Sequence, residues 1–502
     1  MSRTKKFLYN TTSSALLQIV TLIVGLITPR IMLRVYGSEV NGLISSITQF
    51  ISYFNLVEAG LSGATVYALY KPLAQQNHAE INSVVTAAKK FYQQAGYIFV
   101  ALTFVMALAY PLYISSESLG RWEIAALVLI LGVNGALEFF TLSKYRALLT
   151  ADQHTYIISL VSIIQIIVNT TLICSFALLN ANIVLTRFIA LFSIFLRSAI
   201  LMIYCKRKYK YLDYSVTPNF KSLDKRWDAL ILQILGVVHT GAPVVLITLI
   251  LKDLKIVSVY SIFNMVIAGI GNVLSVFTRG TAASFGDVIA KKETKTLQKT
   301  YKEFEFLYYL FITVVYTITF ATIMPFVNIY TRNVTDVNYN VPILGFLFVL
   351  NGLMYSIKTP QGMLVISAGL YKETKVQTIT QALIAVVGGL VLAPMFGIAG
   401  IMVACLLSNI YRDIDLLFFI PKNVTKTPVK DTAIRIARIF LCVVISLIPT
   451  YFITYKPETL LSWAIFAAII GVWSCIVAFT VNFIFDRQEF INVLRRFKLI
   501  KK

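Results

Sequence analysis

Long apolar runs follow one another along the whole chain, with only short polar connections between them. Each run is about 20 residues long, which is the length of α-helix that crosses the ~30 Å hydrocarbon layer of a membrane. We therefore predict an all-α polytopic membrane protein with about 14 transmembrane helices. The expected spans lie near 8–29, 40–68, 91–114, 122–148, 155–179, 183–205, 229–251, 257–279, 304–330, 341–367, 376–395, 398–420, 433–454 and 459–485.

The composition agrees with a membrane protein and excludes several kinds of site. Hydrophobic residues make up 58% of the 502 residues and charged residues only 14%, whereas an average soluble domain is about a quarter charged. The 5 cysteines and 3 histidines lie singly, so we expect no disulfide, metal site or other cofactor. The net charge of +22 lies mostly between the apolar runs, where it indicates contact with anionic membrane lipids and not with nucleic acid.

The distribution of lysine and arginine predicts the orientation of the chain. With the amino terminus inside, about 34 of the 45 basic residues fall in cytoplasmic segments and about seven in outer loops. Both termini are therefore expected in the cytoplasm of a cell-membrane protein. The outer loops are short, the longest about ten residues, so no extracytoplasmic catalytic domain is expected and the protein is predicted not to be an enzyme.

An internal repeat appears when the chain is compared with itself at a shift of 215 to 217 residues. Arg197 then aligns with Arg412, and the pair Asn134-Gly135 aligns with Asn351-Gly352. Two six-helix lobes of the same orientation are an established transporter plan. We predict a first lobe at 1–205, a cytoplasmic linker at 206–228, a second lobe at 229–420, and two further helices with a basic tail at 421–502.

The stretch from Phe50 to Pro72 is apolar enough to span a membrane as one helix, yet it carries a carboxylate, Glu58, near its middle. A charged group facing lipid is costly, so this helix should turn its polar side towards water or another helix. Two interpretations remain open, namely the wall of a transport pathway and a hydrogen-bonded helix contact. The polar residues that share one face are Thr48, Ser52, Asn55, Glu58, Ser62 and Thr65.

Several cations also lie within the predicted spans. Arg197 and Arg412 are each about 15 residues into their helices, at positions that the repeat matches. They indicate a cationic central cavity, although snorkelling to the inner surface, or a local pair of Arg412 with Asp413 or Asp415, explains them as well.

Three further residues have two interpretations each. Lys358 precedes Pro360 and marks either a substrate contact or a plain kink, and Arg30 marks either an outer anion contact or an interfacial anchor. Glu138 is a second intramembrane carboxylate, with the same ambiguity as Glu58. Because the cations outnumber the acids, a phosphate-bearing substrate is expected.

Three segments carry a resemblance to a known family: LRVYGSEVNGLISSITQFISYFNLVEAGLSGATVYALYKPLA, YRALLTADQHTYI and ASFGDVIAKKETKTLQKTYKEFEFLYY. They resemble the polysaccharide-transport branch of the MATE-like multidrug/oligosaccharidyl-lipid/polysaccharide exporter superfamily, and the likeness extends over essentially the whole chain. The resemblance implies two lobes forming a V around a central cavity, and alternating access. It also implies flipping of a polyprenyl-pyrophosphate-linked oligosaccharide to the outer leaflet for cell-surface polysaccharide synthesis.

The residues expected to contact the substrate follow mainly from the charge argument, because the family has no invariant motif to transfer. They are Arg197, Arg412, Lys358, Arg30, Glu58 and Asn55, and the candidates for coupling to H⁺ or Na⁺ are Glu58 and Glu138. Glycosyltransferases and a polymerase of the same pathway are the expected partners. The alternative is a cation-coupled multidrug exporter of the same fold, for which an acidic cavity would be expected.

Overall fold

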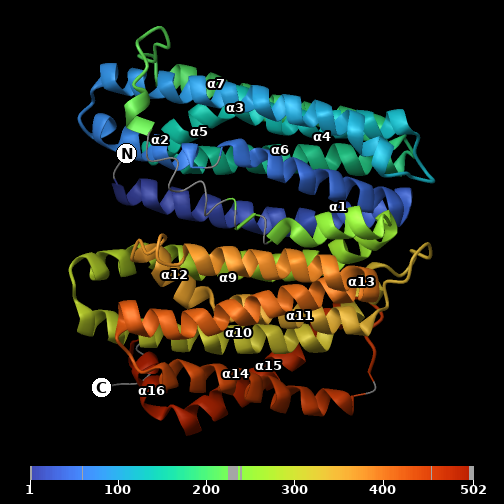
Figure 1. Ribbon diagram of the computed structural model, residues 1–502, viewed down its shortest axis with the longest axis vertical. Helices are drawn as coiled ribbons and strands as arrows, with labels where there is room; N and C mark the ends of the chain where they lie inside the picture. The colour runs from blue at the N-terminus through green and yellow to red at the C-terminus, as the bar shows by residue number, and fades with distance from the viewer. Residues whose placement is uncertain are drawn as a thin grey trace. The chain divides into compact units, whose positions relative to one another are not determined.

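The computed structural model describes residues 3–58, 60–223, 234, 236–237, 240–453 and 455–496, and every regular element among them is a helix (Figure 1). The chain divides into two compact units, Met1–Ser258 and Val259–Lys502, which we call unit 1 and unit 2 and describe separately. The helices begin and end as follows: α1 Arg3–Phe54, η1 Asn55–Glu58, α2 Leu61–Ala74, α3 His78–Tyr113, α4 Arg121–Leu137, η2 Glu138–Leu142, α5 Ser143–Ala151, α6 Thr155–Leu178, α7 Ile183–Lys208, η3 Phe220–Leu223, η4 Ile247–Leu251, α9 Leu254–Ala290, α10 Thr294–Tyr330, α11 Pro342–Ile357, α12 Thr359–Ser367, α13 Lys375–Ile420, η5 Pro421–Thr425, α14 Val429–Tyr451, α15 Leu460–Phe485 and α16 Arg487–Arg496.

The expectation of an all-α polytopic membrane protein is confirmed. Among the described residues, 11 helical runs are long and apolar enough to cross a membrane. Their large apolar side chains are widely exposed, as Phe188, Phe192 and Phe195 on α7 show with 60%, 60% and 51% of their surface accessible. A contiguous apolar surface of this kind is stable only against lipid.

Two of these runs are too long for a single crossing. The run Leu8–Ala74 has 67 residues and would measure about 100 Å as one straight helix. Its backbone departs from helical geometry at Gly37 (φ 79°, ψ 177°). The run Lys375–Thr425 has 51 residues and departs from it at Gly397 (φ 58°, ψ −137°).

The second of these runs is an antiparallel pair of helices. A Cβ atom added to Gly388 would lie 3.0 Å from that of Ala404, and one added to Gly400 would lie 2.2 Å from the Leu392 carbonyl oxygen. Both contacts pair residues at equal distances from Phe396, the residue before Gly397, as expected where a chain reverses direction. Only a glycine adopts the positive φ there without strain. The predicted spans 376–395 and 398–420 therefore correspond to the two arms of α13, whereas the predicted span 229–251 lies partly outside the described residues.

The prediction of one continuous helix from Phe50 to Pro72 is wrong. α1 ends at Phe54, a 3₁₀ turn covers Asn55–Glu58, and α2 starts at Leu61 after Gly60, whose φ is 80°. The apolar pattern of the sequence is continuous through this point, so hydropathy alone does not reveal the break. The break between α1 and α2 is shown by the backbone of Gly60, which has a left-handed conformation that glycine adopts without strain.

The packing of each unit contains contacts related by the shift seen in the sequence. In unit 1, a Cβ atom on Gly135 would lie 2.3 Å from the Phe99 ring; in unit 2, one on Gly352 would lie 2.9 Å from the Tyr316 ring. Both residues of the first contact are displaced by 217 positions from those of the second. Close approach of two helices at a small residue is the usual way that membrane helices associate. The α3–α4 pair and the α10–α11 pair thus share a close contact between a glycine and an aromatic ring at positions that the repeat aligns.

The segment after α7 is anchored on unit 1. Asn82 donates a hydrogen bond to the Tyr211 carbonyl oxygen (2.9 Å), His78 stacks on the Tyr211 ring, and Leu223 is fully buried. The division into a linker at 206–228 and lobes beyond it remains a prediction, because part of that range lies outside the described residues.

Polar loops hold the ends of the unit 1 helices together. Asp152, between α5 and α6, forms ion pairs with Lys6 of α1 (3.4 Å) and Lys208 of α7 (3.8 Å), and it accepts a hydrogen bond from the Tyr209 hydroxyl (2.7 Å). Burial disfavours the ionised form of Asp152, but the hydrogen bonds from His154 and Tyr209 and the nearby charges outweigh burial and lower its pKa. This carboxylate therefore stays charged and joins three elements.

Unit 2 contains a buried ionic network between α10, α14 and the end of α15. Arg435 contacts Glu305 (3.1 Å) and Asp486 (3.3 Å), and Arg438 contacts Asp486 (2.9 Å). The side chain of Glu305 is 2% exposed and that of Arg435 is 6% exposed. In such a network the loss of one partner leaves a charge buried without compensation.

We predict that Arg435→Met destabilises the protein by about 3–5 kcal/mol, because Glu305 loses its cationic partner. The double variant Glu305→Gln, Arg435→Met should regain most of the loss. The measurement is the temperature at which detergent-solubilised protein loses its monodisperse gel-filtration peak. A double variant as unstable as the single one would contradict the account.

We also predict that Gly42→Ala is strongly destabilising. A Cβ atom on Gly42 would lie 1.7 Å from the Leu254 carbonyl oxygen, so the backbone of α1 or α9 must move, at a cost of about 1–3 kcal/mol. Gly25→Ala in the same helix is the matched control, since no atom lies within 4 Å of the added Cβ. The same thermal assay tests both variants. Equal midpoint temperatures for Gly42→Ala and Gly25→Ala would contradict a close contact between Gly42 and the Leu254 carbonyl group.

Candidate functional site

A cavity of about 610 Å³ lies within unit 1 and is lined mainly by polar side chains. Five parts of the chain contribute to it: the end of α1 with η1, α4 with η2, α5, α6 and α7. The volume is typical of a site for a small molecule or head group. Its lining residues are Thr48, Ile51, Ser52, Asn55, Glu58, Ile130, Leu131, Asn134, Gly135, Glu138, Arg146, Gln165, Asn169, Arg187, Ala190, Leu191, Ser193, Ile194 and Arg197.

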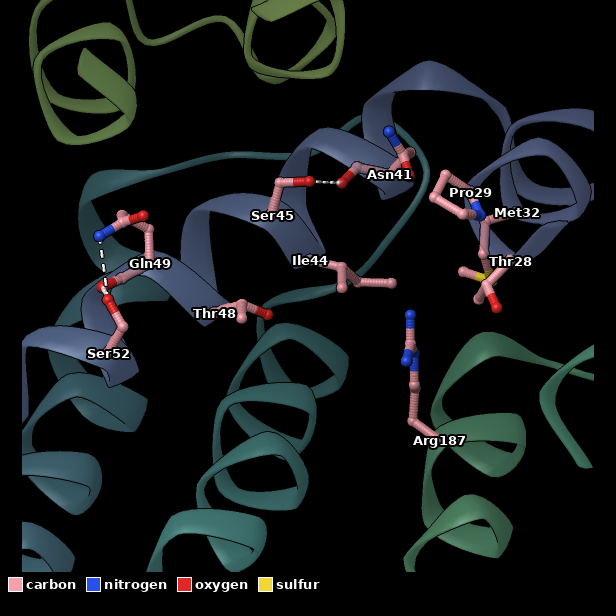
Figure 2. A pocket seen from close by; sticks show the side chains of 10 residues that line it. All are labelled: Thr28, Pro29, Met32, Asn41, Ile44, Ser45, Thr48, Gln49, Ser52 and Arg187. Atoms are coloured by element: carbon pink, nitrogen blue, oxygen red, sulfur yellow. Dashed lines mark hydrogen bonds between the residues drawn. The ribbon is translucent and has the colours of Figure 1, made fainter. Parts of the chain in front are cut away.

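A smaller cavity of about 290 Å³ shares Thr48, Ser52 and Arg187 with the large one. Figure 2 shows Arg187 pointing from its helix towards Thr28 and Ile44 across this space. Two pairs on the wall are hydrogen-bonded: Ser45 donates to the carbonyl oxygen of Asn41, and Gln49 donates to the Ser52 hydroxyl (both 2.9 Å; Figure 2).

The polar face of α1 is longer than the face predicted from the sequence, which began at Thr48. It extends from Asn41 through Ser45 and Thr48 to Glu58, which is about 25 Å of helix at 1.5 Å per residue. That length approaches the thickness of the hydrocarbon layer. The interpretation of the Phe50–Pro72 stretch as a cavity wall is thus supported for Ser52, Asn55 and Glu58, whereas Ser62 and Thr65 are not among the lining residues.

The helix break described above places irregular backbone at the cavity wall. The 3₁₀ turn Asn55–Glu58 contributes both Asn55 and Glu58 to the lining. Backbone groups that leave the helical hydrogen-bonding pattern at membrane depth are tolerated where they line a polar cavity. Discontinuous helices of this kind commonly mark the binding sites of transporters.

Glu138 lies opposite this break and is the centre of the polar contacts. One carboxylate oxygen, Oε1, pairs with Arg146 of α5, and the other, Oε2, lies 3.5 Å from Nη1 of Arg197 on α7. Glu138 begins the five-residue π-helix Glu138–Leu142, a wide turn that is frequent at functional sites. The Ser143 hydroxyl lies 3.2 Å from the Glu58 carboxylate and 3.0 Å from the Glu138 carbonyl oxygen, so it connects the two acids.

The arginines of this cavity outnumber its carboxylates. Arg146, Arg187 and Arg197 face Glu58 and Glu138. Among the described residues no carboxylate pairs with Arg187, and the Nε atoms of Arg187 and Arg197 are buried without a hydrogen-bond partner. The cavity can therefore accept further anionic oxygens, because it has donors that the protein does not satisfy.

Four of the residues predicted from sequence meet in this one cavity: Asn55, Glu58, Glu138 and Arg197. Arg146 was not predicted from the sequence, because it lies at the cytoplasmic end of its predicted span, among residues counted as a loop. The sequence feature that could have predicted it is the spacing of Glu138 and Arg146, which lie about two helical turns apart on the same apolar stretch.

The remaining predicted residues lie elsewhere. Arg30 is exposed on α1, next to Pro29 of the smaller cavity. In unit 2, Lys358 is buried at the junction of α11 and α12, where Nζ donates to Oδ1 of Asn409 (2.5 Å). Arg412 pairs locally with Asp415 (2.5 Å), which is one of the interpretations that the sequence left open. A role for these three residues in binding substrate remains a prediction.

Comparison with known proteins identifies the fold. No protein-family model and no curated protein matches the sequence. Among solved structures, the lipid II flippase MurJ in an inward closed conformation superimposes with a TM-score of 0.67, covering 93% of this chain and 99% of MurJ at 14% identity. MATE family multidrug transporters superimpose in an inward-facing form (TM-score 0.66, 84% of this chain, 96% of that chain, 14% identity) and an outward-facing form (0.57, 86%, 97%, 13%). The chain has the fold that MurJ and the MATE family transporters share.

This result agrees with the resemblance seen in the sequence. This fold is shared by transporters that have been observed in both inward- and outward-facing forms. The alignment spans most of the chain and nearly all of each neighbour, so the fold likeness is not confined to one unit. At 14% identity the likeness concerns the fold, and the chemistry has to be argued from the cavity itself.

We predict that the large cavity is reached by water. In a cysteine-free background, Asn134→Cys should react with an anionic methanethiosulfonate reagent at least about tenfold faster than Leu127→Cys, because only a hydrated thiol ionises and reacts readily. Both residues belong to α4, but Asn134 lines the cavity and Leu127 is fully buried. Equal labelling rates in reconstituted membranes would contradict the cavity.

Proposed function

We propose that the protein is a flippase that moves a polyprenyl-pyrophosphate-linked oligosaccharide from the inner to the outer leaflet of the cell membrane. The observation that carries this proposal is the convergence of Arg146, Arg187 and Arg197 on one polar cavity within a membrane-embedded unit. The likeness in fold to the lipid II flippase MurJ supports it.

The chemistry of the cavity suits a diphosphate. A guanidinium group presents several N–H donors in a planar fork that matches phosphate oxygens, and it does so more strongly in a site of low dielectric constant. The sugars would be held by the amide and hydroxyl groups around them, such as Asn134, Gln165 and Asn169. The polyprenyl tail would stay in the lipid, because moving it into water costs about 0.8 kcal/mol per CH₂ group.

The finer features of the proposal follow the sequence analysis. Fourteen spans, two six-helix lobes and cytoplasmic termini would produce alternating access about a central cavity. Lys358, Arg412 and Arg30 would provide further contacts for phosphate or acidic sugar, and glycosyltransferases and a polymerase would supply and consume the substrate. Glu58 and Glu138 would couple the movement to H⁺ or Na⁺.

A cation-coupled multidrug exporter is the second candidate, and one observation favours it. Glu58 forms no ion pair with any described residue, so its carboxylate is available to a proton or a cation. The three arginines around the same space oppose a cationic drug, since like charges within a protein repel more strongly than in bulk water. The charge of the cavity therefore supports the flippase over the exporter.

The test is lipid flipping by the purified protein in vesicles. A fluorescent polyprenyl-diphosphate disaccharide is placed in both leaflets, and the fraction open to external dithionite is followed with time. Arg197→Gln should slow flipping at least about tenfold, because its side chain is only 13% exposed and losing one partner of a buried charge pair typically costs about 2 kcal/mol or more. Arg146→Gln should slow flipping by a smaller factor, about threefold, because its side chain is 43% exposed.

The matched control is Arg207→Gln, which removes the same charge from the exposed end of α7, beyond the cavity. It should flip at the wild-type rate. Equal rates for Arg197→Gln and Arg207→Gln would refute a substrate role for the cavity arginines. Export of ethidium by the same vesicles, without flipping, would favour the multidrug exporter.

A further inference from the structure

The two arginines that meet at Glu138 come from different helices. Arg146 is on α5 and Arg197 is on α7, and each guanidinium contacts a different oxygen of the same carboxylate. Two cations that contact the same carboxylate repel each other unless an anion lies between them, because the interior of a protein screens charge less than bulk water does. In the absence of substrate, Glu138 supplies that anion.

The contacts of Glu138 leave part of this cationic site unsatisfied. The pair with Arg197 is long, at 3.5 Å, and the Nε of Arg197 has no hydrogen-bond partner. Arg146 is 43% exposed, so its remaining N–H groups are accessible from the cavity. A diphosphate has more oxygens and more charge than a carboxylate, and it can satisfy both guanidinium groups more completely.

The local structure gives Glu138 a means of moving. It is the first residue of the π-helix Glu138–Leu142, in which one extra residue widens the turn. The Ser143 hydroxyl has one proton, and it can donate that proton either to the Glu138 carbonyl oxygen or to the Glu58 carboxylate. A change between these two partners would accompany a change in the shape of the turn.

From this geometry we propose that Glu138 is a tethered stand-in for the diphosphate of the substrate. It holds Arg146 and Arg197 in the empty cavity, leaves them when the diphosphate binds, and returns to them as the head group departs. The inference rests on the proposed function and adds how the substrate is released.

The reason for such a residue is the cost of release. Without Glu138, a departing diphosphate would leave two neighbouring guanidinium groups with no counter-charge, which is unfavourable above all for Arg197, whose side chain is only 13% exposed. A carboxylate on the same protein acts at a high effective concentration and replaces the ligand as it goes. Glu138 therefore weakens equilibrium binding and speeds turnover. It also competes with phospholipid head groups for the two arginines, because a phospholipid has a single phosphate group and binds them less strongly than a diphosphate does.

The experiment compares Glu138→Gln with the wild type in two assays on the full chain. The probe for affinity is geranylgeranyl-diphospho-N-acetylglucosamine in detergent micelles, and the flipping rate is measured in vesicles. The variant should bind the probe about tenfold more tightly, as expected when a competing charged contact is removed, and flip it at least about threefold more slowly. In vesicles rich in phosphatidylglycerol, its flipping should slow further, unlike that of the wild type.

Glu117→Gln is the matched control, since it removes the same charge from unit 1 at an exposed ion pair with Lys255 (3.4 Å) that does not line the cavity. Its affinity should change by less than about threefold, because only the direct charge contact carries the effect. Weaker or unchanged binding by Glu138→Gln would overturn the inference. If Glu138 only positioned the arginines, its removal would lower the affinity of the protein for the probe.

A variant that does not remain monodisperse is replaced by Glu138→Asp, which keeps the charge but is one methylene shorter. Its affinity should rise by a smaller factor, and a fall would overturn the inference. If the wild-type protein flips the probe but Glu138→Gln does not change the affinity, this inference is refuted and the proposed function is not. Wild-type protein that neither binds nor flips it would refute the proposed function as well.

Discussion

The hydrocarbon layer contains no water, so every charge and every irregular stretch of backbone within it must be satisfied by the protein. Two such stretches of unit 1 line its large cavity, the 3₁₀ turn Asn55–Glu58 and the start of the π-helix Glu138–Leu142. The Ser143 hydroxyl contacts a group of each, the Glu58 carboxylate and the Glu138 carbonyl oxygen. The cavity exists where these breaks meet, and the arginines lie there because it is the polar part of the unit.

Unit 2 meets the same constraint differently. Glu305, Arg435 and Asp486 form a closed ionic network, and Arg412 pairs with its near neighbour Asp415. These charges are compensated by partners at close distance, as expected of groups that join helices. In unit 1, by contrast, Arg187 has no acidic partner among the described residues, and its Nε atom is buried without an acceptor. Unsatisfied buried atoms also occur in unit 2, at Nε of Arg438 and at both carboxylate oxygens of Asp413. What favours binding in unit 1 is that its arginines line a cavity, whereas Glu305, Arg435 and Asp486 join three helices.

Much of the fold and half of the site could be predicted from sequence, for identifiable reasons. Apolar runs specify membrane helices because hydropathy is a local property, and intramembrane charges such as Glu58 and Arg197 are conspicuous because they are costly. The break after Phe54 could not be predicted, since it depends on the left-handed conformation of Gly60. The role of Arg146 was missed because a residue at the end of a span resembles a loop residue until the helix is seen to continue past the π turn.

The central claim, that this protein carries a lipid-linked oligosaccharide across the membrane, is tested most directly in cells that lack it. The polyprenyl-diphosphate oligosaccharides of a deletion strain are extracted after intact spheroplasts have been treated with an enzyme that cleaves only those in the outer leaflet. The account predicts an intermediate that accumulates and is protected from cleavage, on the cytoplasmic side. An intermediate that is cleaved as fully as in the parent strain, with no accumulation, would contradict it.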